Sequence, residues 1–134
     1  MIFNKNISRL SFKEKDIEYF KKYLNKTDDI FTYFNIDKQE WYKQHFFLSE
    51  KIVAQILLEM VIKELNGDWI PDFNNENQYK YYNWFNLENG EFVFLGTSYD
   101  SRLMPIPSAL YFKSEEVAKY CEDTFFDLYK IIFT

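Results

Sequence analysis

The chain of 134 residues is poor in the residue types that build most metal centres and many catalytic sites. It contains one cysteine, Cys121, and one histidine, His45. A single cysteine excludes an internal disulfide framework and a cysteine-based zinc site. A single histidine excludes histidine-rich metal sites and argues against a histidine-based catalytic triad. We therefore expect no metal, no cofactor and no disulfide.

Long apolar runs and catalytic motifs are missing as well. No apolar stretch approaches the roughly 18 residues of a membrane span, and the first residues lack the pattern of a signal peptide. We therefore expect a cytoplasmic protein that contacts no membrane. The sequence has no glycine-rich phosphate loop, no paired metal-binding histidines and no nucleophile elbow.

Three weaker catalytic or metal patterns also fail. Residues 72–77 resemble the start of a calcium loop, but Asn77 stands where such a loop needs glycine. We interpret His45 as a packed or surface residue and Cys121 as a small core residue. The sequence thus predicts a binding protein and not an enzyme, with no catalytic residue. An unmarked carboxylate pair remains the enzymatic alternative.

Aromatic residues and acids are what the chain has in abundance. Aromatic residues make up 22% of it, and the net charge is −5. Residues 1–27 carry seven Lys or Arg and three acids, so the acidity belongs to the remainder. Surplus tyrosine suits a partner surface, and an acidic bulk suits a basic partner more than a nucleic acid. Base composition of the gene and solubility are the simpler explanations of these two biases.

Hydrophobic periodicity predicts one α+β domain over residues 1–134, with a helical part at about 11–66 and a sheet plus the last helix at about 67–133. A capping pattern at Ser11 predicts a helix near 12–25, and a weaker one at Asp37 predicts a second helix. Residues 49–67 show the clearest helical spacing.

The second half is predicted to form a three-stranded antiparallel meander and a C-terminal helix. Asn89-Gly90 fits a type I′ turn between two strands, and residues 108–112 (SALYF) predict the third strand. Ser114 caps the last helix, whose two apolar stripes are buried or shared with a partner.

The stretch Gly67–Phe85 (GDWIPDFNNENQYKYYNWF) combines a turn-rich loop with an aromatic strand. Trp69 and Phe73 are expected to pin the loop to the core. Strand alternation places Tyr82 and Trp84 on one side of the sheet and Tyr81 on the other. The predicted partner-binding residues lie on this sheet, on its loops and on the basic N-terminal segment: Tyr79, Tyr82, Trp84, Asp100, Arg102, Lys13, Lys15, Lys21 and Lys22.

The pattern Trp69-x-Pro71-Asp72, followed by Asn77-Gln78-x-Lys80-Tyr81-Tyr82 and by SALYFK at 108–113, resembles small proteins encoded by phages and prophages of Bacteroidetes. The resemblance covers roughly residues 67–133, and no catalytic motif belongs to it. It implies a mobile-element origin and a role as an inhibitor of a bacterial defence complex. An anti-CRISPR protein acting on an RNA-guided nuclease, with type VI-B as the favoured target, is the expectation. The alternative is a phage accessory protein that binds nucleic acid.

Overall fold

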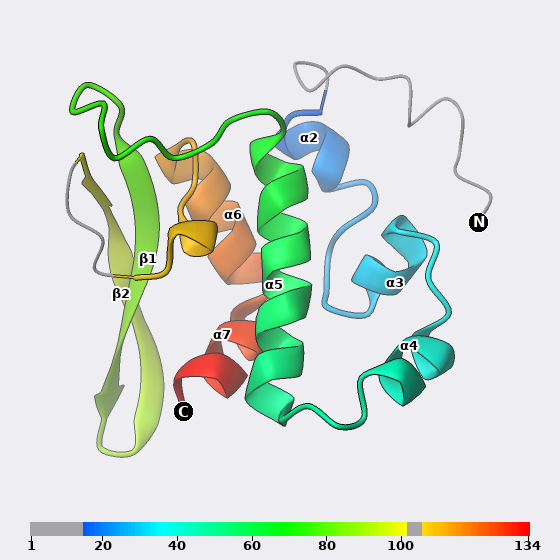
Figure 1. Cartoon of the computed structure of the whole chain (residues 1–134). Coiled ribbons are helices and arrows are strands. Elements are labelled where there is room, and N and C mark those ends of the chain that lie inside the picture. Colours follow the sequence, from blue (N-terminus) through cyan, green and yellow to red (C-terminus); the bar gives the residue numbers. More distant parts are fainter. Residues whose placement is uncertain (1–14, 102–105) are drawn as a thin grey trace.

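The computed structural model describes residues 15–101 and 106–134, and these form an α+β structure, as predicted. A β-hairpin lies on one side, helices α5, α6 and α7 form the middle, and helices α2 to α4 lie on the far side of α5 (Figure 1). The elements in chain order are α2 (Ile17–Phe20), α3 (Asp29–Tyr33), α4 (Lys38–Gln44), α5 (Glu50–Asn66), β1 (Lys80–Glu88), β2 (Glu91–Asp100), the 3-10 helix η1 (Ser108–Leu110), α6 (Glu115–Thr124) and α7 (Phe126–Phe133).

Helix α5 is the central core helix that the periodicity predicts. Its first turn is capped by Ser49, whose hydroxyl accepts from the Ile52 N–H at 3.3 Å. Its end is set by Gly67, which adopts a φ of 62° that other residues rarely tolerate. The buried side of α5 contacts α7, α6 and η1. Within the described residues, no helix is both long and apolar enough to span a membrane.

The N-terminal half contains shorter helices than the sequence suggests. The expected cap Ser11 lies outside the described residues, and α2 begins instead after Asp16, whose carboxylate accepts from the Tyr19 N–H at 3.0 Å. This helix ends at Phe20, and Leu24 in the following turn is fully buried. Helix α3 was not predicted. Helix α4 was, and its cap Asp37 accepts from the Glu40 N–H.

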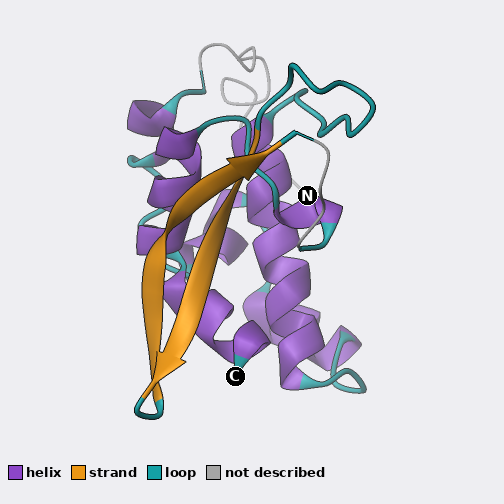
Figure 2. Ribbon diagram, turned by 90° about the vertical axis from the view of Figure 1, so that its left-hand side faces the viewer, coloured by secondary structure: helices purple, strands orange, loops and turns teal. Residues whose placement is uncertain are grey.

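The hairpin confirms the predicted turn. Asn89 and Gly90 both have positive φ, at 53° and 80°, and Glu88 stands directly opposite Glu91. A bulge interrupts the register between Trp84 and Phe85 and leaves one extra residue in β2. The hairpin is long and twisted, and it lies across the helices (Figure 2).

The predicted third strand is wrong. Residues 108–110 form η1, and only Phe112 reaches the sheet, where it exchanges two backbone hydrogen bonds with Tyr81 (3.0 and 2.7 Å). The reason lies in α5. The side-chain amide of Asn66 donates to the carbonyl of Tyr111 at 2.9 Å and accepts from the N–H of Lys113 at 3.0 Å. This clamp holds residues 111–113 between α5 and β1, so they make one bridge and no ladder.

The predicted last helix is divided. Phe125 leaves helical geometry (φ −119°, ψ 31°) and separates α6 from α7. Its fully buried ring lies where both helices meet the core. One apolar stripe is buried in this core. The second stripe packs on the hairpin, where Phe85 contacts Phe126, Tyr129 and Phe133.

Candidate partner-binding surface

The hairpin presents one face to the helices and one face away from them. Asn83 bonds the Ala118 carbonyl of α6, and Phe85 contacts α7, so both point inward. Tyr82 and Trp84 alternate with them and point outward, which confirms the predicted alternation. We define the outer hairpin face as Tyr82, Trp84, Val93 and the bulge residue Leu95.

Trp84 is the prominent side chain of this face. It is 46% exposed, and Leu95 beside the bulge is 42% exposed. Its partner across the ladder is Gly96, and a Cβ at that position would lie 3.6 Å from the indole Nε1. This is an ordinary contact distance, so the indole does not exclude a Cβ there; glycine suits the position because of its φ of 157°. The indole is held by a regular strand and yet faces solvent.

Tyr82 is less available than Trp84. Its ring lies 5.7 Å from Tyr111, which in turn contacts Phe73 of the loop 67–79. Tyr111 is buried, and this burial raises the pKa of its hydroxyl to about 12. The loop therefore covers the outer hairpin face near Tyr82 and leaves it open from Trp84 to the turn.

Tyr79 belongs to a different surface from Trp84. Its ring centroid lies 4.6 Å from Tyr99, and Tyr99 stands opposite Tyr81 in the ladder. Because opposite residues share a face, this tyrosine cluster lies on the side of Tyr81. Tyr79 and Tyr99 are both about half exposed. The sequence-based prediction grouped Tyr79 with Tyr82 and Trp84, whereas the structure places it on the other side of the hairpin.

Lys80 and Asp100 close the open end of the hairpin. The side chain of Lys80 is fully buried, and its ammonium donates to the carbonyls of Asn75 (2.7 Å) and Ser101 (2.9 Å). It also lies over the ring of Phe73, at 5.2 Å. The lysine thus holds the loop against the strand, and its buried ammonium is not accessible to a partner. Asp100 is half-buried opposite it, and Arg102 lies outside the described residues.

The basic N-terminal segment is only partly a surface. Lys13 lies outside the described residues. Lys15 is 8% exposed, and its ammonium pairs with Glu64 at 3.4 Å, so it ties α2 to α5. Lys21 and Lys22 are exposed, and Lys21 contacts Glu18. Of the three predicted lysines that the structure describes, Lys21 and Lys22 are therefore accessible to a partner.

A buried polar network fixes the hairpin on the helices. The amide of Asn83 donates to the Ala118 carbonyl at 2.9 Å, and its oxygen accepts from Thr97 at 2.8 Å. Tyr129 joins the network through Asn83 at 3.3 Å and contacts the Cys121 sulfur at 3.9 Å. Burial raises the pKa of the Cys121 thiol far above its usual range, so this sulfur stays a protonated core group.

Metal chemistry finds no support in the part of the chain that the structure describes. No group of three or more metal-ligating side chains gathers there. The ring of His45 stacks on Trp41 at 4.0 Å, and its Nδ1 lies 2.7 Å from the carbonyl of Trp41. His45 is therefore a packed residue at the end of α4, as interpreted from the sequence.

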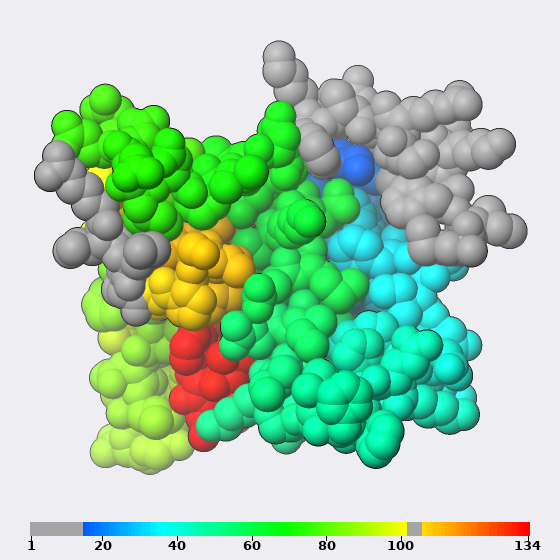
Figure 3. All heavy atoms as spheres, in the orientation of Figure 1, coloured from blue at the N-terminus to red at the C-terminus, as the bar shows by residue number. Residues whose placement is uncertain are grey.

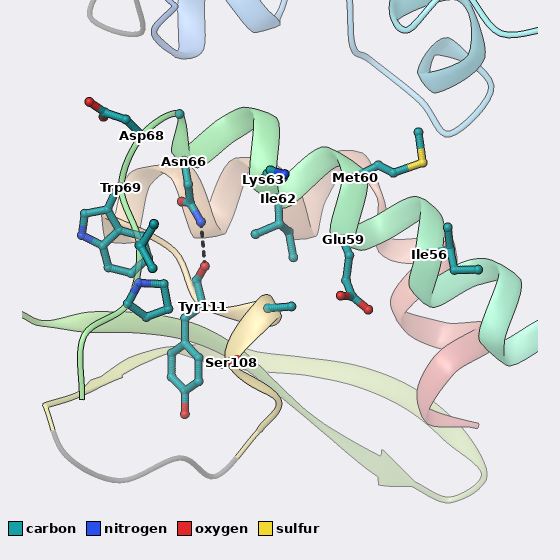
Figure 4. A pocket seen from close by; sticks show the side chains of 14 residues that line it. Ile56, Glu59, Met60, Ile62, Lys63, Asn66, Asp68, Trp69, Ser108 and Tyr111 are labelled. Atoms are coloured by element: carbon teal, nitrogen blue, oxygen red, sulfur yellow. Dashed lines mark hydrogen bonds between the residues drawn. The ribbon is translucent and has the colours of Figure 1, made fainter. Parts of the chain in front are cut away.

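An apolar hollow of about 530 Å³ lies between α5, the segment Gly67–Pro71 and η1 (Figure 4). Ile62 and Glu59 of α5 point toward it, and Trp69 closes one end. The volume falls within the range of about 300–1,000 Å³ typical of ligand pockets. Trp69 borders this hollow, and both Trp69 and Phe73 are half-buried, with Phe73 packed against Tyr111.

Sequence reasoning missed a second exposed aromatic site. Phe46 and Phe47 are 83% and 71% exposed in the turn between α4 and α5, at the opposite side of the molecule from the hairpin (Figure 1). His45 ends α4 and Ser49 begins α5, so the intervening turn points both rings outward. An apolar pair directly before a helix cap was the available signal.

Comparisons of the chain with protein-family profiles, with curated proteins and with solved structures find no match.

Proposed function

We propose that this chain acts by binding another protein in a fixed ratio, and that the outer hairpin face is its main contact surface. The observation that carries the proposal is the exposed indole of Trp84 on an otherwise rigid strand. Tryptophan is enriched among the residues that dominate binding energy at protein interfaces. Leu95 extends the same apolar surface, and the bulge presents it beside the indole.

Rigidity favours this face as a binding surface. The inward residues Asn83 and Phe85 are fixed by the polar network and by stacking on Phe92 at 4.7 Å. A side chain presented on a pre-organised strand loses little conformational freedom on binding, so more of its contact energy appears as affinity. Trp84 therefore meets the structural requirements of an interface anchor.

The charge of the chain favours a basic partner. The net charge is −5, and Glu88 and Glu91 stand together at the end of the hairpin. Opposite charge steers a partner toward such a surface. Combined with the resemblance to phage and prophage proteins, this favours a bacterial defence complex with a basic nucleic-acid channel. An RNA-guided nuclease is the proposed target, with type VI-B first among them.

The experiment is a cleavage assay with a purified type VI-B nuclease, its guide and a reporter RNA. Inhibition that saturates at one chain per nuclease supports the proposal. The variant Trp84→Ala should need at least about tenfold more protein, because one hot-spot residue contributes about 2 kcal/mol or more. The matched control Phe47→Ala removes another exposed ring, which lies at the opposite side of the molecule and is 71% exposed against 46% for Trp84. Undiminished cleavage at excess protein contradicts the nuclease target.

The alternative function, nucleic-acid binding, is favoured by the tyrosine cluster and by the exposed Lys21 and Lys22. Exposed rings stack on single-stranded bases, and lysines neutralise phosphates. The burial of Lys80 and Lys15 removes two of the cations expected to help. This alternative requires salt-dependent binding of an RNA or DNA oligonucleotide by the isolated protein. A complete lack of binding at low salt excludes it.

A further inference from the structure

The outer edge of β1 carries backbone groups that no strand pairs. Tyr81 exchanges its N–H and C=O with Phe112, so these groups point away from β2. Backbone groups alternate along a strand, and those of Phe85 and Leu87 must therefore point to the same edge. The hairpin turn supports the same assignment. In a two-residue turn Glu88 pairs with Glu91 by backbone hydrogen bonds, so the backbone N–H and C=O of the preceding residue, Leu87, point away from β2.

These outward groups have no partner in the part of the chain described. No backbone or side-chain hydrogen bond from residues 15–101 or 106–134 reaches the N–H or C=O of Phe85 or Leu87 on this edge. The segment that was expected to cover them forms η1 just before it reaches the bridge at Phe112. Unpaired strand edges are the part of a sheet that accepts another strand. Among residues 15–101 and 106–134, no segment therefore takes the position of the third strand beyond Tyr81.

A groove of about 430 Å³ runs beside this edge. Its lining combines the edge with side chains of β2, the chain before η1 and the end of α7: Asn83, Trp84, Phe85, Asn86, Leu87, Phe92, Ile106 and Phe133. Figure 3 shows these parts of the molecule side by side on one face. Phe133 is 42% exposed and stacks on Phe85 at 5.9 Å. The groove thus offers apolar contacts next to free backbone groups.

We propose that this edge is a strand-addition site, at which an extended segment of a partner protein becomes the third strand of the sheet. Backbone hydrogen bonds to Phe85 and Leu87 supply affinity, and alternate apolar side chains of the segment enter the groove. The inference rests on the proposed function, since it names how a protein partner is held. It adds a recognition mode to the outer hairpin face, and Trp84, which belongs to that face, also lines the groove.

The charges at the hairpin end specify the segment further. Glu88 and Glu91 are directly opposed, and like charges in that position destabilise a hairpin. Neither carboxylate has an ion-pair partner among the described residues. A lysine or arginine that arrives beside Leu87 relieves this repulsion. We therefore assign the site to an extended segment with alternating apolar residues and a basic end.

A second copy of the chain fits the edge poorly. If two copies paired antiparallel along this edge, with Phe85 opposite Phe85, the hairpin end of each copy would lie against Tyr81 of the other. Phe112 already occupies that place. A foreign strand that ends beside Asn83 meets no such obstacle, which is why the partner segment is the assigned occupant.

The test is a titration of the nitrogen-15-labelled protein with the synthetic peptide Ac-Thr-Val-Thr-Val-Lys-Lys-NH2, read by amide shifts and amide hydrogen exchange. The expected result is exchange slowed by about tenfold or more at Phe85 and Leu87, as for amides that enter a hydrogen-bonded ladder. A control peptide methylated at the two valine nitrogens cannot pair and should leave both rates unchanged. Equal effects of the two peptides, or none at millimolar concentration, overturn the proposal.

One variant and one concentration series complete the test. Leu87→Pro removes an outward N–H and should abolish the effect at Phe85, while continued slow exchange at Asn86 shows that the hairpin is intact. Protection of the edge that grows with protein concentration without peptide means self-pairing and overturns the assigned occupant. The titration needs no natural partner, so its failure and the failure of the nuclease assay are separate outcomes.

Discussion

Asn66 and Tyr111 are joined by a hydrogen bond of 2.9 Å, from the side-chain amide at the end of α5 to a backbone carbonyl 45 residues later. The same side chain accepts from the N–H of Lys113. Asn66 therefore holds Tyr111 and Lys113, the two neighbours of Phe112, which makes the single bridge to Tyr81.

Removal of the two Asn66 hydrogen bonds should lower the stability of the fold strongly. Asn66→Ala deletes the two hydrogen bonds of a buried side chain, to the carbonyl of Tyr111 and from the N–H of Lys113, so the free energy of unfolding should fall by about 2–4 kcal/mol. Urea unfolding followed by circular dichroism measures it. The control Asn25→Ala changes an exposed side chain and should stay within about 0.5 kcal/mol. A similar small loss for Asn66→Ala contradicts the clamp.

Lys80 gives a second stability prediction. Lys80→Met keeps most of the buried aliphatic chain but removes the donor to Asn75 and Ser101, which should cost about 1–3 kcal/mol. Amide exchange of residues 67–79 should accelerate, because the loop loses its fastening. Lys119→Met, which alters only an exposed ion pair, should cost less than about 1 kcal/mol. If exchange in the loop stays unchanged, the lysine does not hold it.

Stability should decline at alkaline pH. Burial raises the pKa of Tyr120 to about 12, above the value of 10.0 for the same group when unburied. Between these values the unfolded chain releases the proton while the folded chain keeps it, so stability is full below pH 10 and falls up to pH 12. Tyr120→Phe should flatten this decline relative to the exposed control Tyr42→Phe. An identical decline in both variants rules out a contribution from Tyr120.

The thiol of Cys121 should be inert in the folded protein. Burial raises its pKa and leaves it without access to solvent. A chromogenic disulfide reagent at pH 8 should therefore react with it only after urea is added, and at the rate of global unfolding. Rapid reaction under native conditions shows that the interface of α6 with the hairpin opens locally.

How far the sequence predicted the structure depends on how local each cause is. Ser49, Gly67 and the pair Asn89-Gly90 act on their own neighbours, so α5 and the hairpin turn were predictable. The missing third strand depends on Asn66, which is distant in sequence. The break between α6 and α7 at Phe125 follows from tertiary packing, and no neighbouring residue in the sequence indicates it.

The candidate site divides in the same way. Alternation along the strand correctly grouped Trp84 with Tyr82 on one side of the hairpin and Tyr81 on the other, and the structure shows that the side of Trp84 faces away from the helices. Tyr79 was grouped with it because the sequence does not show that its ring stacks on Tyr99 of the other strand. Nothing in the sequence reveals that Lys15 and Lys80 are buried, since lysine is rarely buried and both depend on distant carboxylate or carbonyl partners.

The central claim is that a protein partner is bound through the outer hairpin face. The most direct measurement compares three tagged baits in one lysate of a Bacteroidetes host: the native chain, Trp84→Ala and Phe47→Ala, each treated with nuclease. We expect one bacterial protein to be recovered in near-equal amount with the native chain and with Phe47→Ala, and to be lost with Trp84→Ala. Equal recovery with Trp84→Ala, or loss only with Phe47→Ala, contradicts it.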